Sequence, residues 1–253
     1  MIQTETSEKN KEVLDKASKW FLDKIIRNHI SNTLKLSKAS EFNLNPLLAP
    51  YLSAFITGEV TPYGIAKALV YGRIGTSLNT SFGTNLQNFV SEVLGDAYGS
   101  IVSGVDIHFK DQIDGEEKIC QLKLGPNTIN KDDVETINNH FKSVKNLART
   151  NNFRLNSDSL VIGVIYGTEE RLSQHYRNLR DKHHYPIFVG KNFWLRLTGD
   201  ELFFQKLVHT IAETLAEVNA STLIEETIQR LANEKEIVLL AGLTADGSET
   251  ESD

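Results

Sequence analysis

Cysteine is almost absent from the 253-residue sequence, with Cys120 as the single example. A lone cysteine excludes an internal disulfide and any CxxC zinc or redox site. No apolar run approaches the ~20 residues that span a bilayer, and residues 1–13 lack the basic-then-apolar pattern of an export signal. Hydrophobic residues still make up 40% of the chain, which suffices for a sizeable core. We expect a cytoplasmic protein of one large domain, or of one domain with a helical extension.

Charge is slightly unbalanced, since 27 basic residues face 33 acidic ones and the net charge is −6. This balance argues against an indiscriminate nucleic-acid binder. Four of the acids lie in residues 244–253, and this small, polar sequence predicts a disordered acidic tail over 241–253. Residues 169–196 instead hold six basic and three acidic residues, an excess of +3. That local excess is compatible with docking onto a polyanion at one face.

The first 99 residues are predicted to form a helical region. Apolar residues recur at three- and four-residue spacing within 8–40, which is typical of an amphipathic helix. A second apolar stretch covers 47–70, and the glycines, asparagines, serines and threonines of 72–83 predict a loop. A short helix is expected over 84–94.

From residue 100 the sequence alternates between strand and helix patterns, which predicts an α/β domain over 100–240 with helices at its C-terminal end. Segments 101–109 and 118–124 flank Asp114-Gly115, a strong turn signal, and predict an antiparallel hairpin. A helix over 128–149 is expected to begin at Thr128 or Asn130 as its cap. Strands are expected at 159–166 and 185–189, a short amphipathic element at 193–197, and a helix over 201–233 that is broken near 219–221.

The most informative segment is 105–130. Side chains alternate along a strand, so Gln121 and Lys123 fall on one face while their neighbours pack in the core. In a hairpin centred on residues 114–115, Asp106 lies opposite that strand at nearly the same height. An acid, an amide oxygen and a lysine are therefore expected to project together from one end of a sheet.

This trio suits Mg²⁺-dependent hydrolysis of a phosphodiester. Mg²⁺ binds oxygen ligands, of which Asp106 supplies an anionic one and the Gln121 amide a neutral one. The metal polarises the scissile phosphate and lowers the pKa of a bound water, while Lys123 stabilises the charge that develops or orients the water. The alternative is a polar pair on an exposed sheet face that is merely solvated.

The pattern Asp106…Gln121-Leu122-Lys123 resembles the metal-binding motif of the PD-(D/E)xK nuclease superfamily. The surrounding sequence resembles one branch, the type II restriction endonucleases that cut GGNCC-type sites. The matching blocks occur in the expected order at 45–50, 81–84, 125–130, 161–167 and 190–194.

The resemblance implies a central mixed sheet flanked by helices. It also implies Mg²⁺ as the cofactor, no organic cofactor and no membrane. The expected assembly is a homodimer that binds double-stranded DNA, with each subunit cutting one strand of a short palindromic site. In such an assembly, the helical region 1–99 is expected to serve dimerisation or DNA wrapping.

Two positions depart from the family pattern. Val105 replaces the proline that often precedes the first acid, and Gln121 replaces the second acid. The second change removes a negative charge from the metal site, so weaker Mg²⁺ binding is expected unless another acid helps. Glu92, on the helix before the first strand, is the candidate third metal ligand, and Glu117 near the hairpin is a further one. A solvated charge or a local salt bridge is the alternative interpretation of Glu92.

Two groups of residues are candidates for contacting DNA. The helix that follows Lys123 is expected to present its free N–H groups to a phosphate, and asparagine pairs well with adenine edges. Arginine reads guanine bidentately or holds phosphate. A cap or a solvated basic helix face explains each of these residues equally well. The candidates are Asn127, Thr128, Asn130, Lys131, Arg171, Arg177 and Arg180.

The sequence is interpreted as a type II site-specific restriction endonuclease. One alternative is an Mrr-like or repair nuclease, a branch in which glutamine also occupies the position of Gln121. The other is a non-catalytic DNA-binding protein on a decayed nuclease core, which the missing second acid favours and the presence of both Asp106 and Lys123 opposes.

Overall fold

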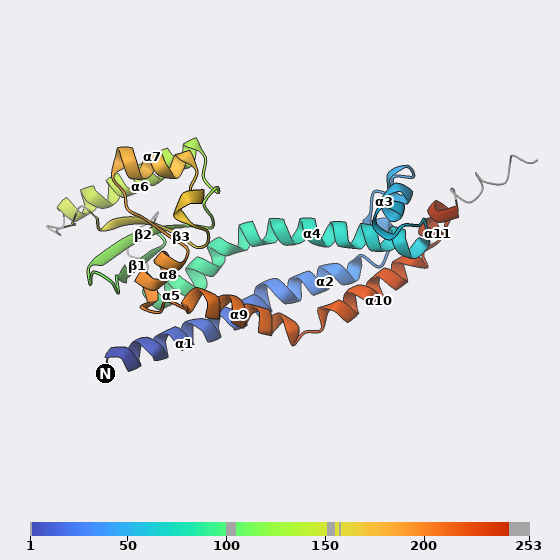
Figure 1. Ribbon diagram of the computed structural model, residues 1–253, viewed down its shortest axis with the longest axis horizontal. Helices are drawn as coiled ribbons and strands as arrows, with labels where there is room; N and C mark the ends of the chain where they lie inside the picture. Colours follow the sequence, from blue (N-terminus) through green and yellow to red (C-terminus); the bar gives the residue numbers. More distant parts are fainter. Residues whose placement is uncertain (1, 100–104, 151–154, 157, 243–253) are drawn as a thin grey trace, which may run out of the picture. The chain divides into compact units, whose positions relative to one another are not determined.

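A computed structural model describes residues 2–99, 105–150, 155–156 and 158–242. Contacts within the chain divide it into two compact units, each made of two separate segments (Figure 1). Unit 1 comprises Met1–Trp20 and Gly83–Ile211, and unit 2 comprises Phe21–Phe82 and Ala212–Asp253. The expected division at residues 99 and 100 follows chain order, whereas each compact unit draws on both halves of the chain. Of the disordered tail predicted over 241–253, the first two residues are instead the end of a helix, and 243–253 lie outside the described residues.

Unit 1 is built on a four-stranded mixed sheet, in the order β1-β2-β3-β4. The strands are β1 (Ile107–Lys110), β2 (Glu117–Lys123), β3 (Leu160–Val164) and β4 (Ile187–Val189). β1 and β2 pair antiparallel, and β2, β3 and β4 pair parallel. The expected α/β fold with a central mixed sheet between helices is therefore confirmed.

Helices cover both faces of the sheet (Figure 1). On one side lie α6 (Lys131–Thr150) and α7 (Gln174–His183), and on the other lie α5 (Gly95–Tyr98) and α8 (Lys191–Thr198). Unit 1 also contains α1 (Ile2–Trp20), the π-helix η3 (Val90–Leu94) and the 3-10 helix η4 (Glu169–Arg171). The sheet is consequently a buried middle layer.

The strand alternation decides which layer each side chain of β2 enters. Ile119 packs with buried residues of β3, α6 and α7 in one apolar cluster, so Gln121 and Lys123, two and four residues further on, point to that same helical layer. On the other face, a Cβ built on Gly163 would lie 2.6 Å from Leu122 and 2.7 Å from Phe193 of α8. The polar pair therefore lies beneath α6, and the face that carries it is covered rather than open to solvent.

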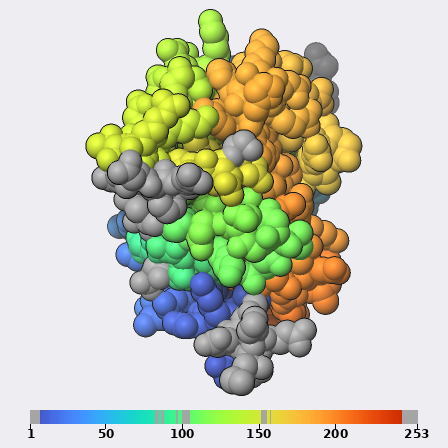
Figure 2. Space-filling view, turned by 90° about the vertical axis from the view of Figure 1, so that its left-hand side faces the viewer, coloured from blue at the N-terminus to red at the C-terminus, as the bar shows by residue number. Residues whose placement is uncertain are grey.

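The β1–β2 hairpin has the turn that Asp114-Gly115 predicts, and the strand pairing confirms it. Gly115 adopts φ +75° and its N–H donates to the Asp111 carbonyl at 2.9 Å; glycine takes this left-handed conformation without a steric penalty. Figure 2 shows the hairpin in green at the surface of unit 1, with the yellow-green residues of α6 above it.

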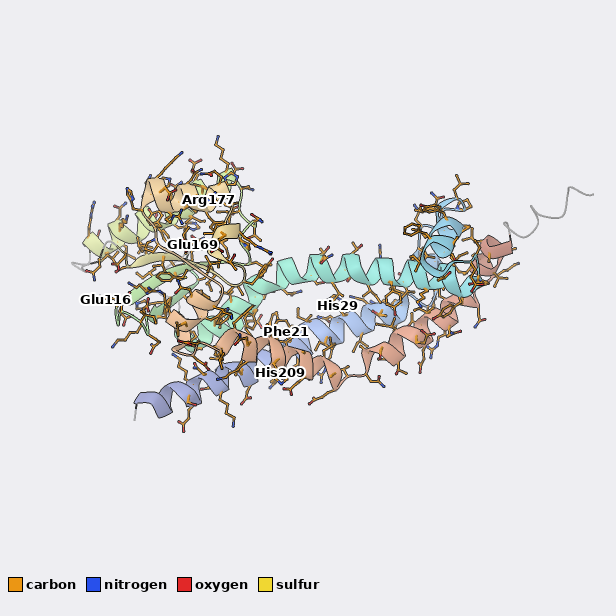
Figure 3. The ribbon with its side chains drawn as sticks, viewed as in Figure 1. Phe21, His29, Glu116, Glu169, Arg177 and His209 are labelled. Atoms are coloured by element: carbon orange, nitrogen blue, oxygen red, sulfur yellow. The ribbon has the colours of Figure 1, made fainter. Side chains whose placement is uncertain are left out.

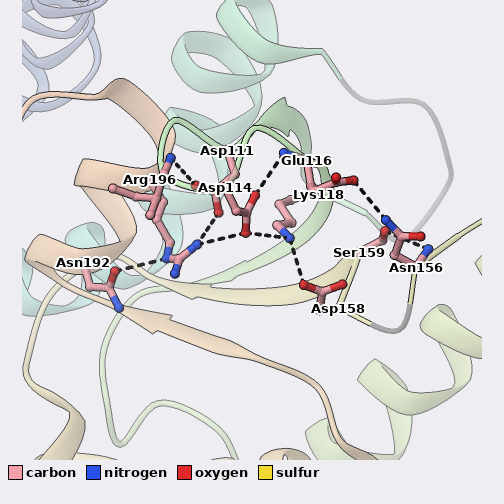
Figure 4. Close-up of polar contacts among 10 residues, drawn as sticks. Asp111, Asp114, Glu116, Lys118, Asn156, Asp158, Ser159, Asn192 and Arg196 are labelled. Carbon is pink, nitrogen blue, oxygen red and sulfur yellow. Dashed lines mark hydrogen bonds and ion pairs between the residues drawn. The ribbon is translucent and has the colours of Figure 1, made fainter.

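Buried polar contacts hold this turn to α8 and to the start of β3 (Figure 4). The Arg196 guanidinium contacts the fully buried Asp111 carboxylate at 2.5 Å and Asp114 at 3.3 Å. The Lys118 ammonium, 1% exposed, contacts Asp114 at 3.0 Å and Asp158 at 3.3 Å. Because β2 runs directly from this network, the network fixes the strand that carries Gln121 and Lys123.

Unit 2 is helical and has a core of its own. Its elements are η1 (Phe21–Ile26), α2 (Arg27–Lys35), η2 (Ala39–Glu41), α3 (Leu48–Thr57), most of α4 (Pro62–Phe89), the end of α9 (Phe203–Ala216), α10 (Ala220–Ala232) and α11 (Lys235–Gly242). Ile65 of α4, Leu231 of α10 and Ile237 of α11 are fully buried in one apolar cluster. No helix among the described residues is long and apolar enough to cross a membrane.

The loop expected over 72–83 is wrong, because α4 runs through this segment without a break. Glycine in a helix costs only ~1 kcal/mol relative to alanine, and tertiary packing of Val70 offsets such a cost. The Thr76 and Thr80 hydroxyls donate to carbonyls four residues earlier, both at 3.0 Å.

By contrast, the predicted break near 219–221 is confirmed by Asn219, whose φ is +48° between α9 and α10. Residues 101–104 of the expected first strand lie outside the described residues.

Candidate active site

Asp106 and Gln121 face each other across the first two strands. The N–H of Asp106 donates to the Cys120 carbonyl at 3.1 Å, and Ile107 pairs with Cys120, so the register places Asp106 opposite Gln121. The Asp106 carboxylate also accepts the N–H of Leu122 at 2.6 Å. The side chain is thereby held against β2.

The Asp106 carboxyl group is partly buried, and its burial raises its pKa above the ordinary range. The Leu122 N–H and the nearby Lys123 and His140 oppose this rise without cancelling it. A carboxylate in such an environment is short of compensating charge. A bound cation would supply that charge.

Gln121 is 8% exposed, and the two ends of its amide have different surroundings. The Nε2 atom lies 3.4 Å from Nδ1 of His140 on α6. The Oε1 atom is buried and has no hydrogen-bond partner among the described residues. A buried acceptor without a partner costs stability, which makes it a candidate metal ligand or water ligand.

Lys123 contacts the first turn of α6. Its Nζ atom lies 3.0 Å from Oδ1 of Asp133. Asp133 and Asn130 also form a reciprocal cap, in which the Asp133 N–H donates to Asn130 at 3.0 Å and the Asn130 N–H donates to Asp133 at 2.9 Å. Burial raises the Asp133 pKa, but the Asn130 N–H and Lys123 outweigh it, and the pKa is lowered overall. Asp133 is therefore an ionised partner that holds the lysine.

The pair of Asp106 and the Gln121 oxygen fits a hard divalent cation, because both offer oxygen and one oxygen lacks a partner. The residues described contain no group of three or more His, Cys, Asp or Glu side chains that suits a metal. The candidate third acids have other partners: Glu92 accepts the Trp20 indole N–H at 2.9 Å, and Glu117 contacts His108 at 2.9 Å at the other end of β2. Neither acid is brought to Asp106 by these contacts.

The four expected DNA contacts around the start of α6 have different positions. Asn130 is the cap of α6, whereas Thr128 bonds the Gly125 backbone, with its hydroxyl donating to the carbonyl at 2.9 Å. If the amide of Asn127 is rotated by 180°, its nitrogen donates to the carbonyls of Pro126 at 3.2 Å and Arg171 at 3.3 Å. Lys131 is exposed at the first residue of α6. Thr128 therefore serves the loop, and Lys131 is the residue of this group whose charge faces solvent.

The three arginines lie on η4 and α7, on one side of unit 1. In Figure 3, Arg177 and Glu169 lie on that side, whereas Glu116 lies at the hairpin. Arg177 donates to the Glu170 carbonyl at 3.3 Å, and Arg180 pairs with Glu169 and Asp181, both at 2.9 Å. Arg171 is exposed. A guanine contact by Arg180 would require its two ion pairs to break.

The site residues predicted from the sequence include neither His140 nor Asp133. Both lie on α6 seven residues apart, on the side that carries the buried Ile137, Phe141 and Val144. Their spacing of two helical turns was visible in the sequence. The missing information was that this side of the helix covers Gln121 and Lys123, which only the tertiary structure supplies.

Two comparisons with known proteins bear on this arrangement. The sequence model of the family described as type II restriction endonuclease EcoO109I matches residues 8–219, which is more than half of the chain and includes every candidate site residue. No curated protein matched the chain.

Proposed function

The chain belongs to the type II restriction endonuclease EcoO109I family, and from this membership we propose that it cuts double-stranded DNA at a short palindromic GGNCC-type site with Mg²⁺ as cofactor. Family membership makes it a site-specific deoxyribonuclease; the metal, the site and the residues are our proposal. The observation that carries the proposal is the Gln121 Oε1 atom, buried without a described partner opposite the Asp106 carboxylate.

In this proposal each residue of the motif has one role. Asp106 and the Gln121 oxygen hold Mg²⁺, which when bound supplies polarisation of the scissile phosphate and acidifies water. Lys123 stabilises the charge that develops on the phosphate or orients the attacking water. Water attacks phosphorus and the 3′-oxygen leaves, so no covalent enzyme intermediate forms. Glu92 joins the metal site only if it releases the Trp20 indole.

DNA is proposed to contact unit 1 at the start of α6 and along η4 and α7. Lys131, Arg171 and Arg177 are the exposed cations among the candidates, and Lys131 and Arg171 suit phosphate contacts. Asn127 and Asn130 remain candidates for base or phosphate contacts beside them. Arg177 and Arg180 are proposed to read guanine or hold phosphate once their contacts with neighbouring acidic residues are exchanged for DNA.

Unit 2 is proposed to form a homodimer, since a palindromic site mirrors a two-fold protein. α3, LAPYLSAFIT, contains no charged residue. Its Phe55 is 77% accessible, and Leu47, the residue before the helix, is 85% accessible. Tyr51, one turn before Phe55, stacks on it at 6.0 Å between ring centroids. Such a contiguous apolar surface is typical of a protein–protein contact, and a second copy is the occupant that the palindrome requires.

Digestion of a sequenced plasmid by the purified protein tests the activity, with Mg²⁺ present and with EDTA as the control. Discrete fragments that disappear with EDTA, and whose ends map to one GGNCC-type sequence, are expected. Smearing would instead favour a repair-type nuclease, and uncut plasmid that still binds in a gel shift would favour a non-catalytic binder.

Two substitutions test the site assignment. Asp106→Ala and Lys123→Ala are expected to abolish cleavage and to leave the circular dichroism spectrum unchanged. Asp15→Ala and Lys11→Ala, which remove the same charges from exposed positions of α1, serve as matched controls and are expected to cut normally. Near-normal cleavage by either site variant would show that the site is wrongly assigned.

Sedimentation of the full-length protein tests the dimer. The wild type is expected to sediment as a dimer at micromolar concentration, and Phe55→Asp as a monomer. Ile113→Asp, at a 54% exposed position of the hairpin in unit 1, is the control and is expected to remain dimeric. A monomeric wild type, or a dimeric Phe55→Asp protein, would exclude α3 as the interface.

A further inference from the structure

Glutamine in a metal site raises a difficulty that a carboxylate does not. A carboxylate offers oxygen at both ends, whereas the glutamine amide offers one oxygen and one NH₂ group, and only the oxygen can bind a cation. If the amide of Gln121 turned over, two donor hydrogens would replace the oxygen in the site. A residue that fixes the orientation of the amide is therefore required for Gln121 to act as a ligand.

His140 has the geometry for this role. Its Nδ1 atom lies 3.4 Å from Nε2 of Gln121, and Gln121 itself lies opposite Asp106 across the first two strands. The neighbours of His140 on α6 anchor it, because Ile137 and Phe141 are fully buried. Phe141 also packs edge-on against Tyr185 at 4.7 Å between ring centroids. The ring is thus held at one height above Gln121.

We propose that His140 is a positioning residue, whose unprotonated Nδ1 accepts a hydrogen from Nε2 of Gln121 and so keeps the amide oxygen as the end that is available to the metal. The proton of the imidazole then resides on Nε2. This proposal rests on the proposed function and adds a partner for the ligand. It explains how a nuclease site retains a usable second ligand after the acid is replaced: the histidine on the neighbouring helix selects the amide oxygen.

The proposal makes a conditional claim about two substitutions. Removing His140 weakens metal binding only while residue 121 is glutamine, because both ends of a glutamate carboxylate are oxygen atoms that can bind the metal. Partners of metal ligands typically contribute about 10-fold to metal affinity. We therefore expect His140→Ala to weaken metal binding about 10-fold in the wild-type background and less than twofold in the Gln121→Glu background. His140→Asn, which keeps an acceptor on the helix, is expected to recover part of the loss.

Binding of Mn²⁺ to the full-length protein, followed by the electron paramagnetic resonance signal of free Mn²⁺, measures this without cleavage. The four proteins of the cycle are wild type, His140→Ala, Gln121→Glu and the double variant. His29→Ala, on α2 of unit 2 (Figure 3), is the matched histidine control and is expected to bind Mn²⁺ like the wild type. Circular dichroism establishes that each variant is folded.

The outcomes separate this inference from the proposed function. A wild type that cuts DNA and a His140→Ala variant that binds Mn²⁺ equally well would overturn the positioning role and leave the nuclease intact. An equal loss in both backgrounds would also overturn it, because His140 would then act on the fold or on Asp106 instead of on the amide. A wild type that neither binds Mn²⁺ nor cuts DNA would overturn the proposed function together with this inference.

Discussion

Replacing Gln121 with methionine is expected to stabilise the protein and abolish cleavage at the same time. Gln121 is 8% exposed and its Oε1 atom has no described partner. Methionine has nearly the same length and shape but no polar group to desolvate. The substitution therefore removes the cost of the buried oxygen while it deletes a proposed metal ligand.

The size of the effect follows from two opposing contributions. An unsatisfied buried acceptor costs about 1–3 kcal/mol, and the long hydrogen bond from Nε2 to His140, lost in the variant, contributes about 0.5–1.5 kcal/mol. The difference is a net gain of about 1 kcal/mol. For a protein of this size, such a gain raises the thermal midpoint by about 2–4 °C.

Thermal unfolding followed by circular dichroism in EDTA measures this gain without any contribution from a bound metal. Leu122→Met, at the next position of β2 on the opposite face, is the control and is expected to be slightly destabilising, by less than about 1.5 kcal/mol. A Gln121→Met protein that melts below the wild type would refute the reasoning. It would mean that the Gln121 oxygen already has a partner, such as an ordered water, and is not held in reserve for a ligand.

Two further expectations concern the hairpin network. Arg196→Ala leaves the buried Asp111 carboxylate without its counter-charge and is expected to lower the unfolding free energy, measured by urea denaturation, by about 3 kcal/mol. The double variant Asp111→Asn/Arg196→Met is expected to lose less unfolding free energy, and an equal loss would contradict the charge argument. Burial raises the pKa of Asp114, but the Glu116 N–H and Lys118 outweigh this effect, so the pKa is lowered overall. The ionised Asp114 carboxylate therefore stabilises the fold at neutral pH, and this contribution is lost progressively as the pH falls below about 4. Asp114→Asn, which keeps a turn-forming pair with the following glycine, is expected to cost at most about 1 kcal/mol at pH 7 and progressively less as the pH falls below about 4. A cost that does not shrink at low pH would assign the effect to the turn instead of the charge.

Local signals in the sequence were sufficient for the hairpin and for the positions of the strands along the chain. The Asp114-Gly115 turn fixes the register that sets Asp106 opposite Gln121, and alternation puts Gln121 and Lys123 on one face. These inferences succeed because turn chemistry and strand periodicity act over a few residues. The unbroken α4 was missed for a related reason: glycine and serine weaken a helix locally, but packing in unit 2 overrides that preference.

The partners of the site residues could not be predicted from the sequence, because each lies on another element. Glu92 meets Trp20 seventy-two residues away, and His140 meets Gln121 only because α6 crosses that point of the sheet. The sequence also suggested that a polar pair on the sheet was a solvated face. Burial of Gln121 beneath a helix shows that the face is covered, and this covering depends on tertiary packing alone.

The way the chain is threaded through its two units has a consequence for inheritance and engineering. The chain passes from one unit to the other at residues 20–21, 82–83 and 211–212, and each passage falls within a helix or between two consecutive helices, α1 and η1. Unit 1 is therefore not encoded by one continuous stretch of the gene, although its sheet and every proposed site residue lie in the longer segment, Gly83–Ile211. A transfer of the whole of unit 1 to a relative would need junctions at all three passages, each of which must continue a helix or join two consecutive ones.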